Sequence, residues 1–89
     1  MKAIVTVVGQ DRVGIIAGVC TALAEFNVNV LDISQTVMQG YFTMMMAVEV
    51  SGCTVPLAEL AARMETTGKE MGLSIRVQRE DIFQAMHRI

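Results

Sequence analysis

The sequence predicts a small α+β fold in which strands and helices follow the order βαββαβ. Four short segments are β-branched or alternate between apolar and polar residues, and two longer segments carry apolar residues at helical spacing. Glycine, proline or asparagine marks the junctions between these segments. With 89 residues, the chain has the length for one domain and one hydrophobic core. We therefore expect a single domain over residues 1–89, with its core in residues 2–80 and a tail from residue 81.

The first unit is a strand, a glycine-containing turn and a helix. Residues 3–8 (AIVTVV) are compact and β-branched, which is typical of a central strand. Residues 15–26 then place their apolar side chains on one helical stripe, at Ile15, Ile16, Val19, Leu23 and Phe26. Asn27 is expected to end this helix. The sequence GQDRVG between the two elements is therefore a strand-to-helix turn.

The next segment predicts a β-hairpin over residues 28–50. VNVLDISQTV and YFTMMMAVEV supply its two strands, and Gln39 with Gly40 supplies the tight turn. In the first of these strands apolar and polar residues alternate, so one face is expected to be buried and the other wet. The apolar residues on the expected inward face are Leu31, Ile33 and Val37.

A second helix, a last strand and a tail complete the chain. The helix is expected to begin near Thr54 and Pro56 and to end at Gly72, which suits a left-handed C-cap. Residues 73–78 (LSIRVQ) alternate as a strand with one wet face. The tail DIFQAMHRI predicts a short helix over residues 81–89, in which Asp81 caps the helix and three apolar residues share one face, Ile82, Met86 and Ile89. We expect it to pack on its own sheet or on that of a second copy.

The order of elements restricts the topology. Two strand–helix–strand crossovers joined by a hairpin, each right-handed, give a four-stranded antiparallel sheet with both helices on one face. This is the ferredoxin-like plan. It leaves one face and at least one edge of the sheet uncovered, and a free edge tends to pair with another chain. Because 53% of the residues are hydrophobic, a homo-oligomer is the economical expectation.

Composition and charge exclude several classes of partner. The net charge of −2 argues against nucleic acid and against membrane surfaces, because both attract clusters of Lys and Arg. No run of apolar residues is long enough to span a bilayer, and the start of the chain does not resemble a secretory signal. We therefore expect a cytoplasmic protein.

The sequence predicts neither a metal site nor a cofactor. Cys20 and Cys53, with the single histidine His87, cannot supply a structural zinc site, and we interpret both cysteines as buried thiols. Met44, Met45 and Met46 resemble a soft Cu(I) ligand set, but on a strand Met45 points away from its neighbours. Core filling is therefore the expected role of the methionine run.

The GQDRVG turn is the candidate binding site. The helix that follows it directs free N–H groups into the turn, where a carboxylate or phosphate would be stabilised. The structural alternative is that Gly14 only allows a tight turn, Asp11 caps the helix and Arg12 is a solvated charge. The sequence leaves both interpretations open.

The run VGQDRVGIIAGVCTALAEFNVNVLDISQ resembles the ACT domain, a small-molecule sensing module attached to many amino-acid biosynthetic enzymes and present alone in some bacterial regulators. The resemblance depends on the D-R-x-G-I turn and on NVNVLDI at residues 27–33, and with the element order it covers residues 2–80. It implies a stand-alone domain of a bacterial or archaeal type, regulatory and allosteric. It also implies a homodimer whose sheets pair edge to edge.

In that family a small ligand is held where the first turn of one copy meets the second strand of the other. Carried onto this chain, the ligand-binding residues are Asp11, Arg12, Gly14, Ile15 and Asn29. A zwitterion needs N–H donors for its carboxylate and oxygen acceptors for its ammonium, and this set offers both. Some amino-acid-binding members have a polar side chain where this chain has Gly9. Because residues 1–89 show no catalytic domain, we expect the regulated target to be a separate, unidentified protein partner.

Other functions of the same fold fit less well. A metal chaperone would carry C-x-x-C in the first turn, and an RNA-binding sheet would carry exposed aromatic residues with a basic surround. An acylphosphatase-like hydrolase would use Arg12 and Asn29, but the turn lacks the longer glycine-spaced loop and Asp11 would repel phosphate. His87 has no evident nucleophile or acid beside it, so we expect no enzyme. A ligand-free protein-interaction module stays open as the alternative.

Overall fold

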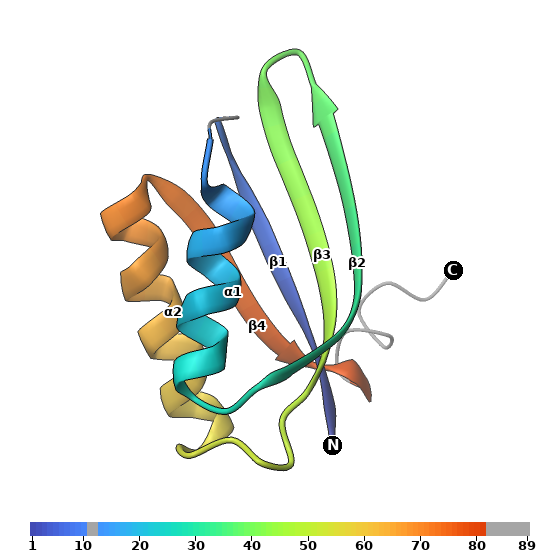
Figure 1. Cartoon of the computed structure of the whole chain (residues 1–89), viewed down its shortest axis with the longest axis vertical. Coiled ribbons are helices and arrows are strands. Elements are labelled where there is room, and N and C mark those ends of the chain that lie inside the picture. The colour runs from blue at the N-terminus through green and yellow to red at the C-terminus, as the bar shows by residue number, and fades with distance from the viewer. Residues whose placement is uncertain (11–12, 82–89) are drawn as a thin grey trace.

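The computed structural model describes residues 1–10 and 13–81, which form the predicted βαββαβ order (Figure 1). The elements are β1 (Lys2–Gln10), α1 (Ile15–Glu25), β2 (Asn29–Met38), β3 (Tyr41–Glu49), α2 (Leu57–Met71) and β4 (Leu73–Arg79). The strands form one antiparallel sheet in the order β2-β3-β1-β4, and both helices lie on the same face of it. The predicted ferredoxin-like α+β fold is confirmed.

The central strand β1 forms the middle of the core. Ala3, Val5 and Val7 of β1 are fully buried on the face that the helices cover. Val5 lies opposite Met46 of β3 on one side and opposite Val77 of β4 on the other. The intervening residues of β1 point to the other face of the sheet, which no helix of the described chain covers. We call this second face the open face.

The ends of both helices follow the expected turn chemistry. Asn27 follows α1 with a positive φ of 59°, and its Nδ2 donates a hydrogen bond to the carbonyl of Gly52 at 2.9 Å. Pro56 precedes α2 with φ at −59°, and Gly72 closes α2 in the left-handed region with φ at 73°. Gly72 leads directly into β4, so the cap also sets the direction of the last strand.

Methionine fills much of the core, as the sequence predicts. Met44 and Met46 of β3 and Met64 of α2 are fully buried, whereas Met45 is 39% exposed on the open face. An unbranched thioether adapts to the irregular space between sheet and helices. Cys20 and Cys53 are free thiols packed against this core, and both are partly buried, so the prediction of buried thiols is confirmed in part.

The expected inward face of β2 is wrong. Leu31, Ile33 and Val37 are 46%, 40% and 54% exposed. Leu31 is the extra residue of a β-bulge between Val30 and Asp32, so it drops out of the alternation. Ile33 and Val37 do lie on the helix-facing side, opposite buried Met46 and Phe42, but neither helix extends over this edge strand.

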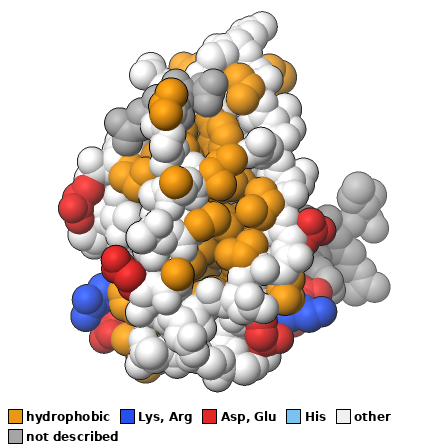
Figure 2. Space-filling view, in the orientation of Figure 1, with side chains coloured by type: hydrophobic (Ala, Val, Ile, Leu, Met, Phe, Trp, Pro, Cys, Tyr) orange, Lys and Arg blue, Asp and Glu red, His pale blue; other side chains and the backbone are white. Residues whose placement is uncertain are grey.

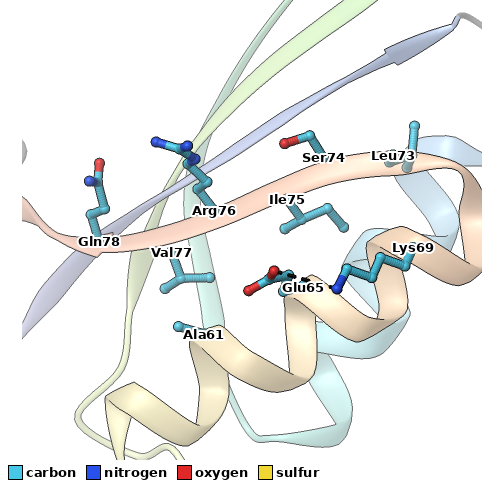
Figure 3. Close-up of a pocket in the computed structure, with 9 residues that line it drawn as sticks. All are labelled: Ala61, Glu65, Lys69, Leu73, Ser74, Ile75, Arg76, Val77 and Gln78. Carbon is cyan, nitrogen blue, oxygen red and sulfur yellow. Dashed lines mark ion pairs between the residues drawn. The ribbon is translucent and has the colours of Figure 1, made fainter.

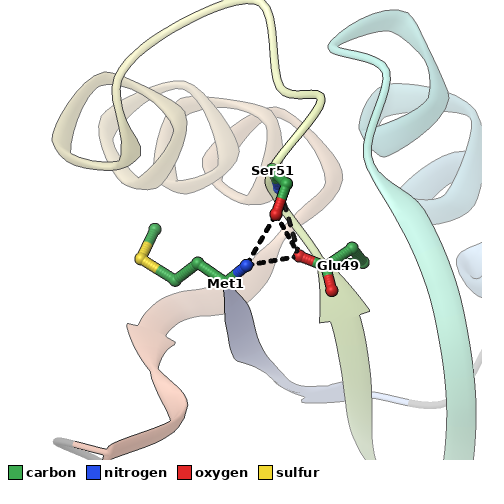
Figure 4. Close-up of polar contacts among 3 residues, drawn as sticks. All are labelled: Met1, Glu49 and Ser51. Atoms are coloured by element: carbon green, nitrogen blue, oxygen red, sulfur yellow. Dashed lines mark hydrogen bonds and ion pairs between the residues drawn. The ribbon is translucent and has the colours of Figure 1, made fainter.

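The start of the chain is held to the end of β3 by a charged cluster (Figure 4). The Met1 ammonium donates to Glu49 Oε2 at 2.7 Å and to Ser51 Oγ at 2.6 Å, and the Ser51 hydroxyl donates to the same carboxylate at 2.7 Å. The hydrogen bond from the ammonium, followed by that from Ser51, lowers the pKa of Glu49 to about 2. Glu49 is therefore a structural ion-pair partner.

Only the first residue of the predicted tail helix, Asp81, lies within the described chain. Glu80 and Asp81 begin a helical turn directly after β4, and Asp81 is paired with Arg79 at 2.8 Å. The rest of the predicted helix, residues 82–89 with His87, lies outside the described residues. Among the residues that are described, neither helix has the length and hydrophobicity needed to cross a membrane.

Candidate functional site

The turn between β1 and α1 presents the start of a helix to solvent. Gly14 precedes α1 with φ at 91°, and its carbonyl accepts the hydrogen bond from Gly18 N at 2.9 Å. The N–H groups of the first turn of α1 have no carbonyl partner within the helix. No described side chain caps them either. The described part of the turn therefore offers backbone donors, while Asp11 and Arg12 lie outside the described residues.

Two of the predicted site residues have clear structural roles of their own. The Ile15 side chain is 2% exposed and belongs to the core, so only its backbone N–H is available to a ligand. Gly14 has a positive φ that other residues rarely adopt, and an added Cβ would meet no described atom within 4 Å apart from its chain neighbours. The backbone conformation, and not a close contact with a described residue, therefore favours glycine here.

Gly9 has a packing explanation. A Cβ at Gly9 would lie 2.4 Å from Cδ2 of Leu73, the first residue of β4. A side chain at residue 9 would therefore require the Leu73 side chain to move, and Gly9 itself offers no side-chain atom to a ligand. A ligand at this turn must therefore rely on backbone groups and on the residues that follow Gly9.

Asn29 lies at the opposite end of the sheet from the turn. It pairs with Glu49 of β3, which in turn pairs with Lys2 of β1, whereas the turn follows Gln10. The eight residue steps from Lys2 to Gln10 correspond to about 25 Å along an extended strand. One chain therefore does not bring Asn29 to the turn, and the predicted set of site residues can be complete only between two copies.

The outer edge of β2 has the features of a surface that pairs with another chain. β2 is the last described strand on its side of the sheet, so no strand within residues 1–10 and 13–81 lies beside the outward backbone groups of Asn29–Met38. Ile33 and Val37 add exposed apolar side chains on the helix-facing side of this edge. Figure 2 shows hydrophobic side chains gathered between α1 and the β2–β3 hairpin. The sequence signal for this surface was the apolar alternation of β2, which we had assigned to the core.

A groove lies at the other edge of the sheet, between α2 and β4 (Figure 3). Its volume is about 520 Å³, and Ile75 and Val77 of β4 point into it toward Ala61 of α2. Glu65 and Lys69 form an ion pair of 3.8 Å across its rim. This groove has no signal of its own in the sequence, because its residues have the pattern of an ordinary contact between a helix and a strand.

The described residues contain no group of three His, Cys, Asp or Glu side chains that could hold a metal ion. Two of the described aspartates outside the turn have local partners. Asp32 Oδ1 accepts from the N–H of Ile33 at 2.9 Å, and Asp81 pairs with Arg79, whose pKa is raised by this carboxylate. Neither contact assembles a nucleophile with a base.

Comparison with known proteins identifies the class that this fold and turn define. Residues 2–78 match the family model of the ACT domain, and the chain belongs to that family. It is 56% identical over 88 residues to a UPF0237 protein of Bifidobacterium longum, with 99% of this chain and 98% of that protein covered. The chain thus spans almost the whole length of this relative.

Solved structures agree with this assignment. An ACT domain protein from Streptococcus pneumoniae superposes with a TM-score of 0.83 at 45% identity, and 98% of each chain is covered. The ligand-free regulatory subunit of aspartate kinase from Thermus thermophilus superposes with a TM-score of 0.66 at 26% identity, covering 86% of this chain and 50% of that one. The fold of this chain is therefore found in a regulatory subunit as well as in a separate small protein.

Proposed function

We propose that this chain is a ligand-sensing regulatory domain that works as a homodimer and acts on a separate partner protein. Its ligand is an amino acid or a related small molecule, held at the β1–α1 turn of one copy and the start of β2 of the other. Membership in the ACT family supports the regulatory role. The likeness to a regulatory subunit of aspartate kinase, an enzyme named for an amino acid, supports the class of ligand.

The observation that carries the proposal is the position of Asn29 relative to the turn. If two copies pair antiparallel through β2 about a twofold axis, the first residue of one strand lies beside the last residue of the other. Asn29 of the second copy then lies near Met38, at the end of the sheet where β1 leads into the turn. The same pairing satisfies the free edge of β2.

The twofold arrangement also accounts for the exposed apolar residues of β2. An axis perpendicular to the sheet keeps the helices of both copies on one face. The α1 helix of each copy then flanks the joined β2 strands, and Ile33 and Val37 lie between the two helices. Burial of such side chains contributes roughly 25 cal/mol per Å² of apolar surface removed from water. A shared site at this junction links ligand binding to the geometry of the dimer.

The chemistry of the turn suits a zwitterion. Free N–H groups at the start of α1 would donate hydrogen bonds to a carboxylate, and the Asn29 amide oxygen with the Asp11 carboxylate would accept hydrogen bonds from an ammonium group. A regulatory signal requires that the ligand bind two arrangements of the dimer with different affinity, commonly by ~1 to 3 kcal/mol. The partner protein would distinguish these arrangements.

A thermal-shift screen tests the proposal. The purified protein is melted with each of the common amino acids, nucleotides and central metabolites, and its mass in solution is measured for every hit. A ligand at about 100 times its Kd should add ~2.7 kcal/mol, which shifts the melting temperature by roughly 10 °C for a domain of this size. The Asp11→Ala variant should lose the shift, whereas Glu70→Ala on the exposed side of α2 should keep it.

The alternative is a ligand-free interaction module, in which the β2 surface binds protein and the turn binds nothing. A dimer that melts unchanged across the whole panel would favour this alternative and contradict ligand sensing. An acylphosphatase-like activity has less support, because it needs the turn and Asn29 together in one chain, where they lie at opposite ends of the sheet.

A further inference from the structure

The outer edge of β4 has backbone groups that no described strand pairs with. β4 is the last described strand on its side of the sheet, so no strand within residues 1–10 and 13–81 lies beside Leu73–Arg79 on that side. About half of the residues of an edge strand direct their N–H and C=O groups away from the sheet. The α2 helix packs on the face of β4 and does not pair with these groups. The edge can therefore take up an additional strand.

The groove between α2 and β4 runs along this edge (Figure 3). Its volume of about 520 Å³ lies within the range of roughly 300 to 1,000 Å³ that is typical of binding pockets. Ile75 and Val77 supply an apolar wall, and Ala61, Glu65 and Lys69, each four residues apart, supply the α2 wall. The ion pair between the two charged residues is exposed, so it contributes little to stability and can open for an incoming chain. Side chains on the helix-facing side of an added strand would enter this groove.

The opposite face of β4 presents a positive charge. Arg76 lies between Ile75 and Val77 in sequence, but its side chain points away from α2, on the open face beside Thr6 of β1. It is exposed and makes no ion pair with a residue in the described ranges 1–10 and 13–81. A residue directly opposite Arg76 on an added strand would lie about 5 Å away, where an acidic side chain is favoured and a basic one is disfavoured. The edge therefore favours a segment in which an acidic residue lies between two apolar residues.

The same charge disfavours a second copy of the chain at this edge. If two β4 strands paired antiparallel over all seven of their residues, Arg76 of one copy would lie opposite Arg76 of the other. Combined with the proposed pairing through β2, such a contact would also join dimers into an open-ended sheet. The edge is thus better suited to an extended segment of a different protein.

We infer that the β4 edge and the α2–β4 groove bind an extended segment of the partner protein as an added strand, with apolar side chains in the groove and an acidic side chain opposite Arg76. Main-chain hydrogen bonds hold the segment, and the groove and the arginine select its sequence. The inference rests on the proposed function only in that the chain acts on a separate protein. It leaves the β2 edge to the dimer, so the two bound segments lie at the outer ends of the joined sheet.

A peptide titration followed by NMR tests the inference on the full chain. The probe is a capped peptide with the centre Val-Glu-Val flanked by serine and threonine. Its matched controls carry the centre Val-Lys-Val or a fully N-methylated backbone, which cannot donate hydrogen bonds. At millimolar concentration the probe should shift the amide signals of Leu73–Arg79 and of the groove residues on α2, and the N-methylated peptide should not. Shifts confined to β2, or no shift with the probe, would overturn the inference.

A charge exchange tests the role of Arg76. The lysine peptide should bind the original chain roughly two- to fivefold more weakly than the glutamate peptide. Arg76→Glu should reverse this preference, whereas Arg63→Glu, the same change on α2 outside the groove, should keep it. If Arg76→Glu keeps the preference for glutamate, the proposed pairing with Arg76 is wrong.

Amide hydrogen exchange distinguishes the other occupants of the edge. Without peptide, the outward amides of β4 should exchange quickly at every protein concentration, and the probe should slow them. Slow exchange that persists on dilution would assign the edge to another part of the same chain, such as residues 82–89, and slow exchange that is lost on dilution would assign it to a second copy. Either result contradicts the inference. These experiments use no small-molecule ligand, so their failure is distinct from a failure of the thermal-shift screen.

Discussion

The two edge strands of the sheet, β4 and β2, differ in whether a helix covers them and in how exposed their apolar side chains are. At the β4 edge, α2 lies over the strand, and Leu73 and Ile75 are 7% and 3% exposed. At the β2 edge neither α1 nor α2 lies over the strand, and Ile33 and Val37 are exposed although they sit on the helix-facing side. Two strands with the same kind of alternating sequence thus differ in burial. We call the β4 edge, which α2 covers, the closed edge, and the β2 edge, which neither α1 nor α2 covers, the open edge. The difference is that the β4 strand packs against α2, whereas the β2 strand leaves apolar side chains exposed on the helix-facing side.

The largest effect on stability is expected from a substitution that disrupts the packing of α2 on β4 at the closed edge. An added Cβ at Gly68 of α2 would lie 2.8 Å from the Leu73 carbonyl oxygen and 2.9 Å from Cγ1 of Ile75. Gly68→Val should push α2 away from β4 and lower the free energy of unfolding by roughly 3 kcal/mol in urea denaturation. Thr67→Val, a β-branched substitution at the neighbouring half-buried position, is the control and should have little effect. Equal stability of the two variants would mean that the α2–β4 contact is not tight.

The next largest effect is expected on dimer formation, from a charge placed on β2 at the open edge. Ile33→Lys places a charge on the helix-facing side of β2 and should raise the dissociation constant of the dimer at least about tenfold. Thr36→Lys places the same charge on the opposite face of the same strand and should leave the dimer intact. Light scattering with size-exclusion chromatography measures both. Because Ile33 is already exposed, unfolding of the isolated chain should change little; a dimer unaffected by Ile33→Lys would place the interface elsewhere.

A smaller effect is expected at the turn. Gly14 has φ at 91°, so Gly14→Val should destabilise the chain by about 1 to 2 kcal/mol through backbone strain and should also weaken ligand binding. Gly14→Asn should recover most of the stability, because asparagine tolerates the left-handed region. Chemical denaturation compares the three proteins. If valine and asparagine behave alike, the backbone conformation is not the reason for glycine.

The smallest effect is expected on the pH dependence of stability, from the Met1–Glu49 contact at the other end of the sheet. The pKa of Glu49 falls from an ordinary 4.5 to about 2 in the folded chain. A lowered pKa stabilises the folded state fully above pH 4.5, and this contribution is lost as the pH falls towards 2. Glu49→Gln should therefore flatten the decline of stability over this range, whereas Glu70→Gln should not. Parallel acid titrations followed by circular dichroism would detect the difference.

Most of the fold could be predicted because each element carries a local signal. Gly72 and the Gln39–Gly40 turn have the positive φ values that their residue types favour, and the alternation of β3 correctly separated Met45 from the buried methionines. The bulge at Leu31 was not predictable in this way. A single extra residue leaves the composition of a strand unchanged but removes that residue from the alternation.

The exposure of β2 could not be predicted from the chain either. Alternation shows that a strand has an apolar face, but which helix covers that face depends on tertiary structure. Here α1 and α2 reach β1, β3 and β4 and leave β2 uncovered. For the candidate site, the resemblance to the ACT domain implied that Gly14 of one copy and Asn29 of another share a ligand. The structure shows that these two residues lie at opposite ends of one sheet, so a single chain does not bring them together.

The central claim, a ligand site shared by two copies, is tested most directly by mixing two defective variants. Asp11→Ala and Asn29→Ala are titrated calorimetrically, alone and after joint refolding, with the compound that gives the largest thermal shift. Neither variant should bind alone, but each mixed dimer regains one intact site, so a symmetric site predicts about a quarter of the wild-type stoichiometry. A mixture that binds no better than its components would contradict a shared site.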